Sequence, residues 1–375
     1  MSEDRWETSA RISELIDDAF NESNHHQRAR LYRQALALAY QHGDEELTQR
    51  AAFMFALMNS SLGYAEEAMR AYLPHVKEHQ IVNQMFGADR YEVWPYIKVV
   101  EHLPEFPGIN AERIERYVAN LSERVQERFS WRLAEWNTRL QIANTMGDAV
   151  SARRWLDLRE REDRELARKA KPFEDNQELA METGSPICGA RSRQMAIETL
   201  LLEGEYEAAF EKLERLRTMA GSCMNICRSA PHRIFGLILR PLRENGKLDL
   251  AEEIHQRGVA IVQGNGGQLR AVGEHIQHLA VTDRPEAAAK LFHDHLAISF
   301  TSATPYHQFH FLAHALPLGE TAFNQVALEA LPREIRRPFT APAALQSWAE
   351  ERVQLLARQF DARNGNAMFA DVLNR

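Results

Sequence analysis

A chain of 375 residues can bury a large core and can form two domains. With 45% hydrophobic and 26% charged residues it has an ordinary globular composition, and its formal net charge of −8 argues against nucleic acid as a partner, since nucleic-acid binders usually carry a basic excess or stripe. The amino-terminal segment lacks the basic region and apolar core of a signal peptide, and no apolar run approaches the roughly 20 residues of a membrane span. Three cysteines do not make a disulfide framework in such a chain, so we expect a cytoplasmic protein with no membrane partner.

Helical periodicity begins near the amino terminus. Amphipathic helices are predicted over residues 8–22, 28–40, 47–62 and 65–78. The next stretch departs from this pattern, because Pro95 falls where a helix is kinked or has just begun, and Pro104 and Pro107 bracket a loop.

The least regular stretch lies in the middle of the chain. Helices over 130–145 and 149–170 precede it, and helical periodicity resumes after it and ends with a closing helix over about 343–361. We therefore expect an amino-terminal helical-repeat region over 1–170, an irregular linker or hinge over 171–191, and a carboxy-terminal helical-repeat region over 192–375.

One sequence device recurs through the chain. A helix ends at a turn residue and an alanine follows five positions later, as in Gly63–Ala68, Gly147–Ala152, Gly204–Ala209, Gly246–Ala251 and Asp283–Ala288. Glycine ends a helix because it accepts a left-handed backbone, and a small alanine lets two helices cross closely. A single hairpin cannot bury its apolar stripe alone, so hairpins stack on one another. The pattern predicts an all-α fold of stacked antiparallel helical hairpins.

The device resembles the tetratricopeptide repeat (TPR). GEYEAAF after Leu202 places Tyr206 two positions beyond the turn glycine, and large residues stand eleven positions before a turn at Tyr32, Trp136 and Phe235. The uneven spacing of the turns indicates a TPR-like α-solenoid with long helices and irregular copies.

A wider resemblance covers roughly residues 90 to 300. The order of YEVWPYIKVVEHLPEFPGINAERIE, Cys188, GEYEAAFEKL, Cys227 and LILRPLRENGKLDLAEEIHQRG is similar to a group of uncharacterised bacterial TPR-like proteins. The resemblance implies a helical-repeat protein and brings no catalytic residues with it. The first cysteine region of that group often reads C-x-x-C, whereas this chain has Ser185 in the earlier position.

Two groups of residues could bind a metal ion. Cys188, Cys223, Cys227 and His232 could form a tetrahedral zinc site, although buried cysteines more often pack as small apolar side chains. Seven histidines cluster later in the chain, at positions 275, 278, 293, 295, 307, 310 and 314. His307, His310 and His314 share one helix face, but the first and last lie about 10 Å apart along the axis, so we favour a partner-binding groove that includes Tyr306.

A third group surrounds Pro95. Trp94 and Tyr96 stand beside Arg90 and Lys98, and aromatic residues at such positions are usually core. Arg90, Trp94 and Lys98 would share one helix face if Pro95 sits in a first turn, and two cations around an aromatic suit an acidic peptide group.

No Walker loop, nucleophile elbow, H-E-x-x-H or dinucleotide turn is present in the sequence. We therefore expect a non-enzymatic helical-repeat protein that binds a peptide or protein on its concave face. The alternatives are a metal-dependent enzyme and a ligand-sensing regulator, each using the histidine-rich groove.

Overall fold

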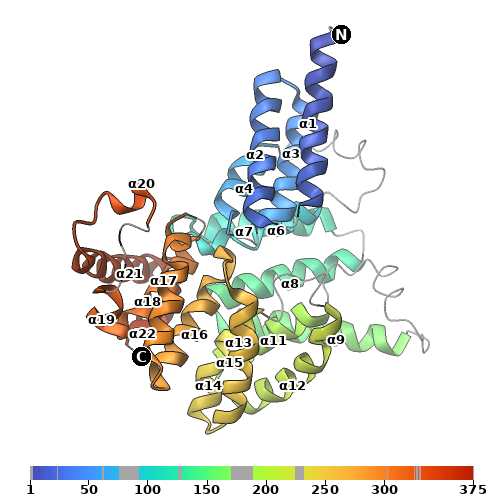
Figure 1. Ribbon diagram of the computed structural model, residues 1–375. Coiled ribbons are helices and arrows are strands. Elements are labelled where there is room, and N and C mark those ends of the chain that lie inside the picture. The colour runs from blue at the N-terminus through green and yellow to red at the C-terminus, as the bar shows by residue number, and fades with distance from the viewer. Residues whose placement is uncertain are drawn as a thin grey trace. The chain divides into compact units, whose positions relative to one another are not determined.

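The computed structural model describes residues 3–22, 24–60, 63–75, 93–125, 129–169, 189–223, 232–301, 303–324, 326, 328 and 331–374, and within these ranges all regular structure is helical (Figure 1). The prediction of an all-α fold is confirmed. The chain forms two compact units, Met1–Leu103 and Pro104–Arg375. Within the same ranges no helix combines the length and apolar character needed to cross a bilayer. The predicted hinge over 171–191 lies outside the described residues, apart from its last three.

Unit 1 is a small helical bundle. Its helices are α1 (Glu3–Asn21), α2 (His25–His42), α3 (Glu45–Asn59), α4 (Ala65–Tyr72) and α6 (Val93–Val100). Asn24 caps α2 by accepting hydrogen bonds from the amides of His26 and Gln27. Pro95 occupies the first turn of α6, which is one of the two positions that the sequence left open, and there its missing amide proton costs nothing.

Unit 2 contains most of the chain. Its helices are α7 (Ala111–Val125), α8 (Phe129–Met146), α9 (Ala149–Lys169), α11 (Gly189–Leu202), α12 (Tyr206–Cys223), α13 (His232–Leu237), α14 (Leu239–Glu244), α15 (Leu248–Val262), α16 (Leu269–Val281), α17 (Pro285–Thr301), α18 (Pro305–Ala315), α19 (Gly319–Asn324), α20 (Arg333–Arg336), α21 (Pro342–Asn364) and α22 (Met368–Leu373). Successive helices pack in pairs: α8 with α9, α11 with α12, α13–α14 with α15, and α16 with α17; α18 packs on α21.

The helix turns have the predicted geometry. Gly204 and Gly246 adopt left-handed backbones, with φ of 76° and 71°, and Asp283 is a non-glycine residue in the same region, with φ of 56°. The alanines that follow, such as Ala209 and Ala251, are completely buried. The predicted role of this device in ending one helix and packing the next is confirmed at these positions.

The first helices of the pairs also pack against one another, in the order α8, α11, α13, α16 and α18. Two glycines inside helices make the closest crossings. A Cβ at Gly236 would meet the backbone of Ala271, and a Cβ at Gly273 would lie 2.8 Å from the carbonyl oxygen of His310. These glycines bring α16 against α13 on one side and α18 on the other.

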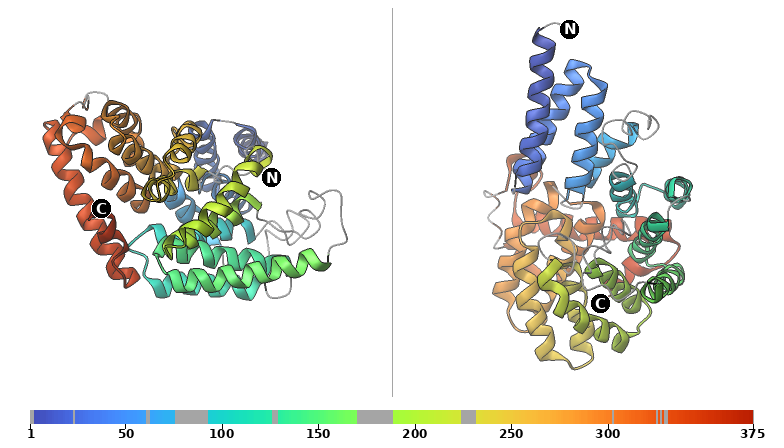
Figure 2. Two further views of the ribbon diagram at one scale, coloured as in Figure 1. Left: turned by 90° about the horizontal axis from the view of Figure 1, so that it is seen from below. Right: turned by 90° about the vertical axis from the view of Figure 1, so that its right-hand side faces the viewer.

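Unit 2 closes on itself. The side-chain amides of Asn364 and Asn366 donate to the Met146 carbonyl at the end of α8, at 3.0 and 2.8 Å. Arg363 donates to the carbonyls of Phe106 and Pro104, at 3.0 and 2.8 Å. The left view of Figure 2 shows the red carboxy-terminal helix reaching the green helices at the start of this unit. The carboxy-terminal helices of unit 2 therefore return to the residues with which the unit begins.

Candidate functional site

A cavity of about 210 Å³ lies in unit 2. It is lined by α8, α11, α13–α14, α16 and α18, with Tyr206 of α12, while Met368 and Val372 of α22 close one side. Leucines of α11 and α13 supply most of the remaining apolar wall. The polar lining consists of Asn144, Glu198, Tyr206, Arg240, Glu244, Arg270, Glu274, Gln277, His310 and His314. Apolar walls with a few convergent polar groups are typical of a ligand site.

Two helices supply the most concentrated polar groups. On α16, Arg270, Glu274 and Gln277 stand at i, i+4 and i+7, and this spacing places them on one face toward the cavity. On α18, His310 and His314 stand at i and i+4 and line the same cavity. The close crossing at Gly273 brings these two faces together.

The carboxylates of the cavity each have a cationic or imidazole partner. Buried Glu198 lies 3.2 Å from Arg233, and Glu244 accepts a hydrogen bond of 2.6 Å from Arg240. Glu274 lies 3.3 Å from His314. Burial by itself would raise the pKa of Glu274, but His314, and then Arg270 and Arg240, lower it below its usual value. Two of these carboxylates therefore have an arginine partner, whereas Glu274 has the imidazole of His314.

His310 is the most unusual group of the lining. Its side chain is 1% exposed, and neither ring nitrogen has a hydrogen-bond partner among the described residues. Burial, and next the charge of Arg270, hold the pKa of His310 well below 6.5, so the ring is neutral near pH 7. A buried polar group without a partner is costly, and such groups occur where a ligand or a water completes the site.

Tyr306 joins the cavity to the core behind it. Its ring is completely buried, and its hydroxyl accepts hydrogen bonds from Arg233, at 3.2 Å, and from Arg270. Both guanidinium groups also lie over the ring, at 5.8 and 5.4 Å from its centroid. Tyr306 therefore fixes the position of Arg270 at the cavity wall.

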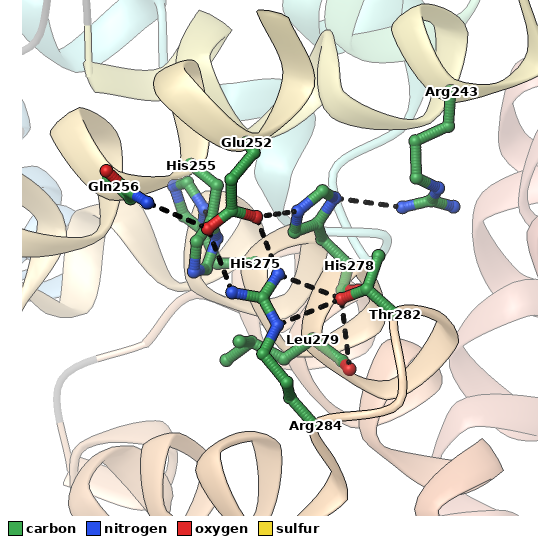
Figure 3. Close-up of polar contacts among 9 residues, drawn as sticks. All are labelled: Arg243, Glu252, His255, Gln256, His275, His278, Leu279, Thr282 and Arg284. Atoms are coloured by element: carbon green, nitrogen blue, oxygen red, sulfur yellow. Dashed lines mark hydrogen bonds and ion pairs between the residues drawn. The ribbon is translucent and has the colours of Figure 1, made fainter. Parts of the chain in front are cut away.

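A second histidine group lies between α15 and α16 (Figure 3). Nδ1 of His255 lies 3.0 Å from Nδ1 of His275, so only one of these two atoms can carry a proton. Arg243 donates to Nδ1 of His278 at 3.3 Å, and because a guanidinium can only donate, Nε2 must carry the proton that His278 shares with Glu252 at 3.2 Å. The geometry assigns His278 a neutral ring.

The charges around this group support a neutral, structural role. Burial, and then the neighbouring His278, lower the pKa of His255 to about 4, and burial holds the pKa of His275 well below 6.5. Arg284 donates two hydrogen bonds to Glu252, at 2.9 and 2.7 Å, and this is the main cause that lowers the pKa of Glu252 to about 2. The network ties α15 to α16 and to the start of α17.

The structure divides the predicted residues of α18 into two sets. His310 and His314 line the cavity, whereas Tyr306 and His307 lie behind it in the core. His307 is 3% exposed, with its Nε2 atom 3.6 Å from Glu105, and its Nδ1 atom accepts a hydrogen bond from the Arg270 amide. The predicted helix face therefore contributes two residues to the cavity wall and one, His307, to the core, where the Arg270 amide of α16 contacts it.

The predicted residues around Pro95 belong to unit 1. Arg90 lies outside the described residues, and so does the side chain of Trp94, although its backbone belongs to α6. Tyr96 is 1% exposed and packs in the core. Lys98 is partly buried and lies 3.6 Å from the buried carboxylate of Glu101.

The predicted zinc ligands fall mainly in undescribed stretches. Cys188 and Cys227 lie outside the described residues. Cys223 is the last residue of α12, and its side chain is not among those described. His232 is the first residue of α13 and is buried. Within the described part of the chain, no three His, Cys, Asp or Glu side chains are grouped to hold a metal ion. The zinc site stays a prediction.

Sequence reasoning missed Arg270, Glu274 and Glu198. A signal for the first two was present in LRAVGEHIQHLAV, where Arg270, Glu274 and Gln277 form a polar stripe on a largely apolar helix. Glu198 offers no such signal, since it becomes notable only through its contact with Arg233, which is distant in the sequence.

The comparison with protein-family models finds no match to this chain, and no curated protein matches it significantly.

Proposed function

We propose that this chain is a TPR-like helical-repeat protein that binds a short segment of a peptide or protein partner in the cavity of unit 2. The observation that carries the proposal is the lining of the cavity, since the first helices of successive pairs all contribute to it. Helical solenoids place the first helix of each hairpin on the inner surface and bind partners there.

The TPR-like assignment is supported by local geometry. Left-handed turn residues end the first helix at Gly147, Gly204, Gly246 and Asp283, and completely buried alanines follow each of them. The pairs so formed are neighbours in the order of the chain. This arrangement favours a repeat array whose carboxy-terminal helices have folded back onto α8.

The volume of the cavity favours a small occupant. About 210 Å³ is below the roughly 300–1,000 Å³ of a site for a drug-sized molecule, so one or two residues of a partner fit, but a whole helix does not. The same volume favours a ligand-sensing regulator as the second candidate, with a free small molecule in place of the peptide segment.

Peptide retention tests the proposal directly. Purified protein is mixed with a pool of random heptapeptides, separated by ultrafiltration, and the retained peptides are identified by mass spectrometry. The variant Gln277→Trp fills the cavity from a partly exposed lining position, and Gln354→Trp places the same side chain on the exposed surface of α21 as its control.

We expect wild type and Gln354→Trp to retain a common set of peptides and Gln277→Trp to lose it. Retention that Gln277→Trp does not change rejects this cavity as the binding site. Retention of small metabolites from a cell extract, but of no peptide, with the same dependence on Gln277 would select the ligand-sensing alternative.

A further inference from the structure

We infer that the cavity holds a carboxylate of its ligand against Arg270 and His310, an inference that rests on the proposed binding role of this cavity. The ligand class is therefore a carboxylic acid, supplied by an acidic side chain, by a chain terminus or by a free organic acid.

Charge pairing singles out Arg270. The other carboxylates and cations of the lining are matched within 4 Å, as Glu244 with Arg240 and Glu274 with His314, while Glu198 has Arg233 behind the wall. Among the described residues, no carboxylate lies within ion-pair distance of Arg270. The positive charge of Arg270 nevertheless lowers the pKa of Glu274 from a longer distance. A bound anion would give this cation the partner that the other charges already have.

One edge of the Arg270 guanidinium lacks a hydrogen-bond partner among the described residues. Its Nη1 atom donates to Tyr306, whereas its buried Nε and its Nη2 make no hydrogen bond to any described residue. The same edge of Arg33 binds a carboxylate elsewhere in the protein, because its Nε and Nη2 donate hydrogen bonds to the two oxygens of Glu67 at 2.7 and 2.8 Å. Arg153 donates hydrogen bonds to the two carboxylate oxygens of Glu203 from the same two nitrogens. The planar fork matches the two oxygens of a carboxylate.

His310 supplies a second polar group of the same cavity lining that lacks a hydrogen-bond partner among the described residues. Its ring lies 4.7 Å from the ring of Tyr306, the residue that also positions Arg270. A neutral imidazole has one N–H to donate, and both nitrogens of His310 lack a partner among the described residues. The positive charge of Arg270 that disfavours protonation of His310 would be offset by a bound carboxylate.

Three small probes test for the carboxylate and distinguish a side-chain carboxylate from a terminal one. N-acetylglutamate α-amide presents a side-chain carboxylate, N-acetylalanine presents a terminal one, and N-acetylglutamine α-amide is the neutral match of the first. Affinities are measured by ligand-observed NMR titration with wild type, Arg270→Gln and Arg270→Lys. Arg215→Gln makes the same change at an exposed position of α12 and is the control. Circular dichroism confirms that each variant is folded.

We expect at least one acid to bind wild type and Arg215→Gln, with the neutral probe about 10- to 100-fold weaker, the range for hydrogen bonds to a charged group. Arg270→Gln should weaken the acid by the same factor, and Arg270→Lys by less, because lysine keeps the charge without the fork. Equal affinity for acid and amide, no binding of either acid, or unchanged binding in both Arg270 variants would overturn the inference. If Gln277→Trp still abolishes peptide retention in that case, the cavity remains the proposed binding site and only the carboxylate inference is rejected. If Gln277→Trp leaves retention unchanged, the binding role and the carboxylate inference are both rejected.

Discussion

Replacing Gly273 with alanine should destabilise unit 2, although alanine is the better helix former. Gly273 lies inside α16, and an added Cβ would sit 2.8 Å from the His310 carbonyl oxygen and 3.1 Å from the Cα of Phe311. Ordinary van der Waals contact begins near 3.4 Å, and both neighbours are backbone atoms that cannot rotate away. Helix α18 must therefore shift by several tenths of an ångström.

The two opposing effects can be compared. Overpacking of this kind costs about 1–3 kcal/mol, and the better helix propensity of alanine returns about 0.5–1 kcal/mol. The net loss therefore lies between about 0 and 2.5 kcal/mol in the free energy of unfolding, centred on about 1 kcal/mol, or roughly 2–4 °C in melting temperature at that central value. Gly236→Ala, which meets the backbone of Ala271, should behave in the same way.

Thermal and urea unfolding followed by circular dichroism measure the loss. Gly108→Ala is the matched control, since this exposed loop glycine has nothing within 4 Å of its Cβ position and its φ is not left-handed. A gain of stability in Gly273→Ala would contradict the close crossing of α16 and α18. Alanine can raise the free energy of unfolding through its helix propensity only if its Cβ meets no such obstacle.

Three further predictions concern other parts of the molecule. Ala209→Leu should cost about 1–3 kcal/mol in unfolding free energy, because Ala209 is completely buried at a helix crossing, and a neutral result by urea titration would mean that the crossing lies elsewhere. Lys98→Glu should lower the thermal stability of the protein more than Lys98→Met does, because it places a second carboxylate beside buried Glu101, and equal melting temperatures would contradict this. The buried His255 has its pKa lowered to about 4 in the folded state, so the unfolded state binds more protons below pH 6.5. The contribution of His255 to stability should therefore be full above pH 6.5 and should fall by about 1–3 kcal/mol, a range already discounted for solvent screening, as the pH drops to about 4. Urea midpoints that stay constant over this window would be incompatible with a buried neutral ring.

Much of the fold was predictable because its determinants are local. Apolar residues at helical spacing indicate helices without reference to the rest of the chain, and a glycine such as Gly204 ends a helix through its own backbone freedom. Ala209 and Ala251, which stand five positions after such turns, are completely buried in one core cluster.

The cavity was only half predictable. The sequence placed His310 and His314 on one helix face, which is a matter of 3.6 residues per turn, and both line the cavity. The same reasoning grouped His307 with them, but which part of that face is covered depends on the neighbouring helices, and His307 is buried beside Glu105.

The partners of the charged groups and the set of residues that line the cavity depend on the tertiary structure alone. Arg233 meets Glu198 and Tyr306 across distant stretches of the chain, and Asn364 returns to the carbonyl of Met146, so periodicity in the sequence carries no trace of either contact. The unpaired nitrogens of Arg270 are a property of this kind, because whether a described carboxylate lies near them depends on how all the surrounding helices pack. A local pattern determines which elements form and which face is apolar, whereas the pairing of charges depends on how those elements pack.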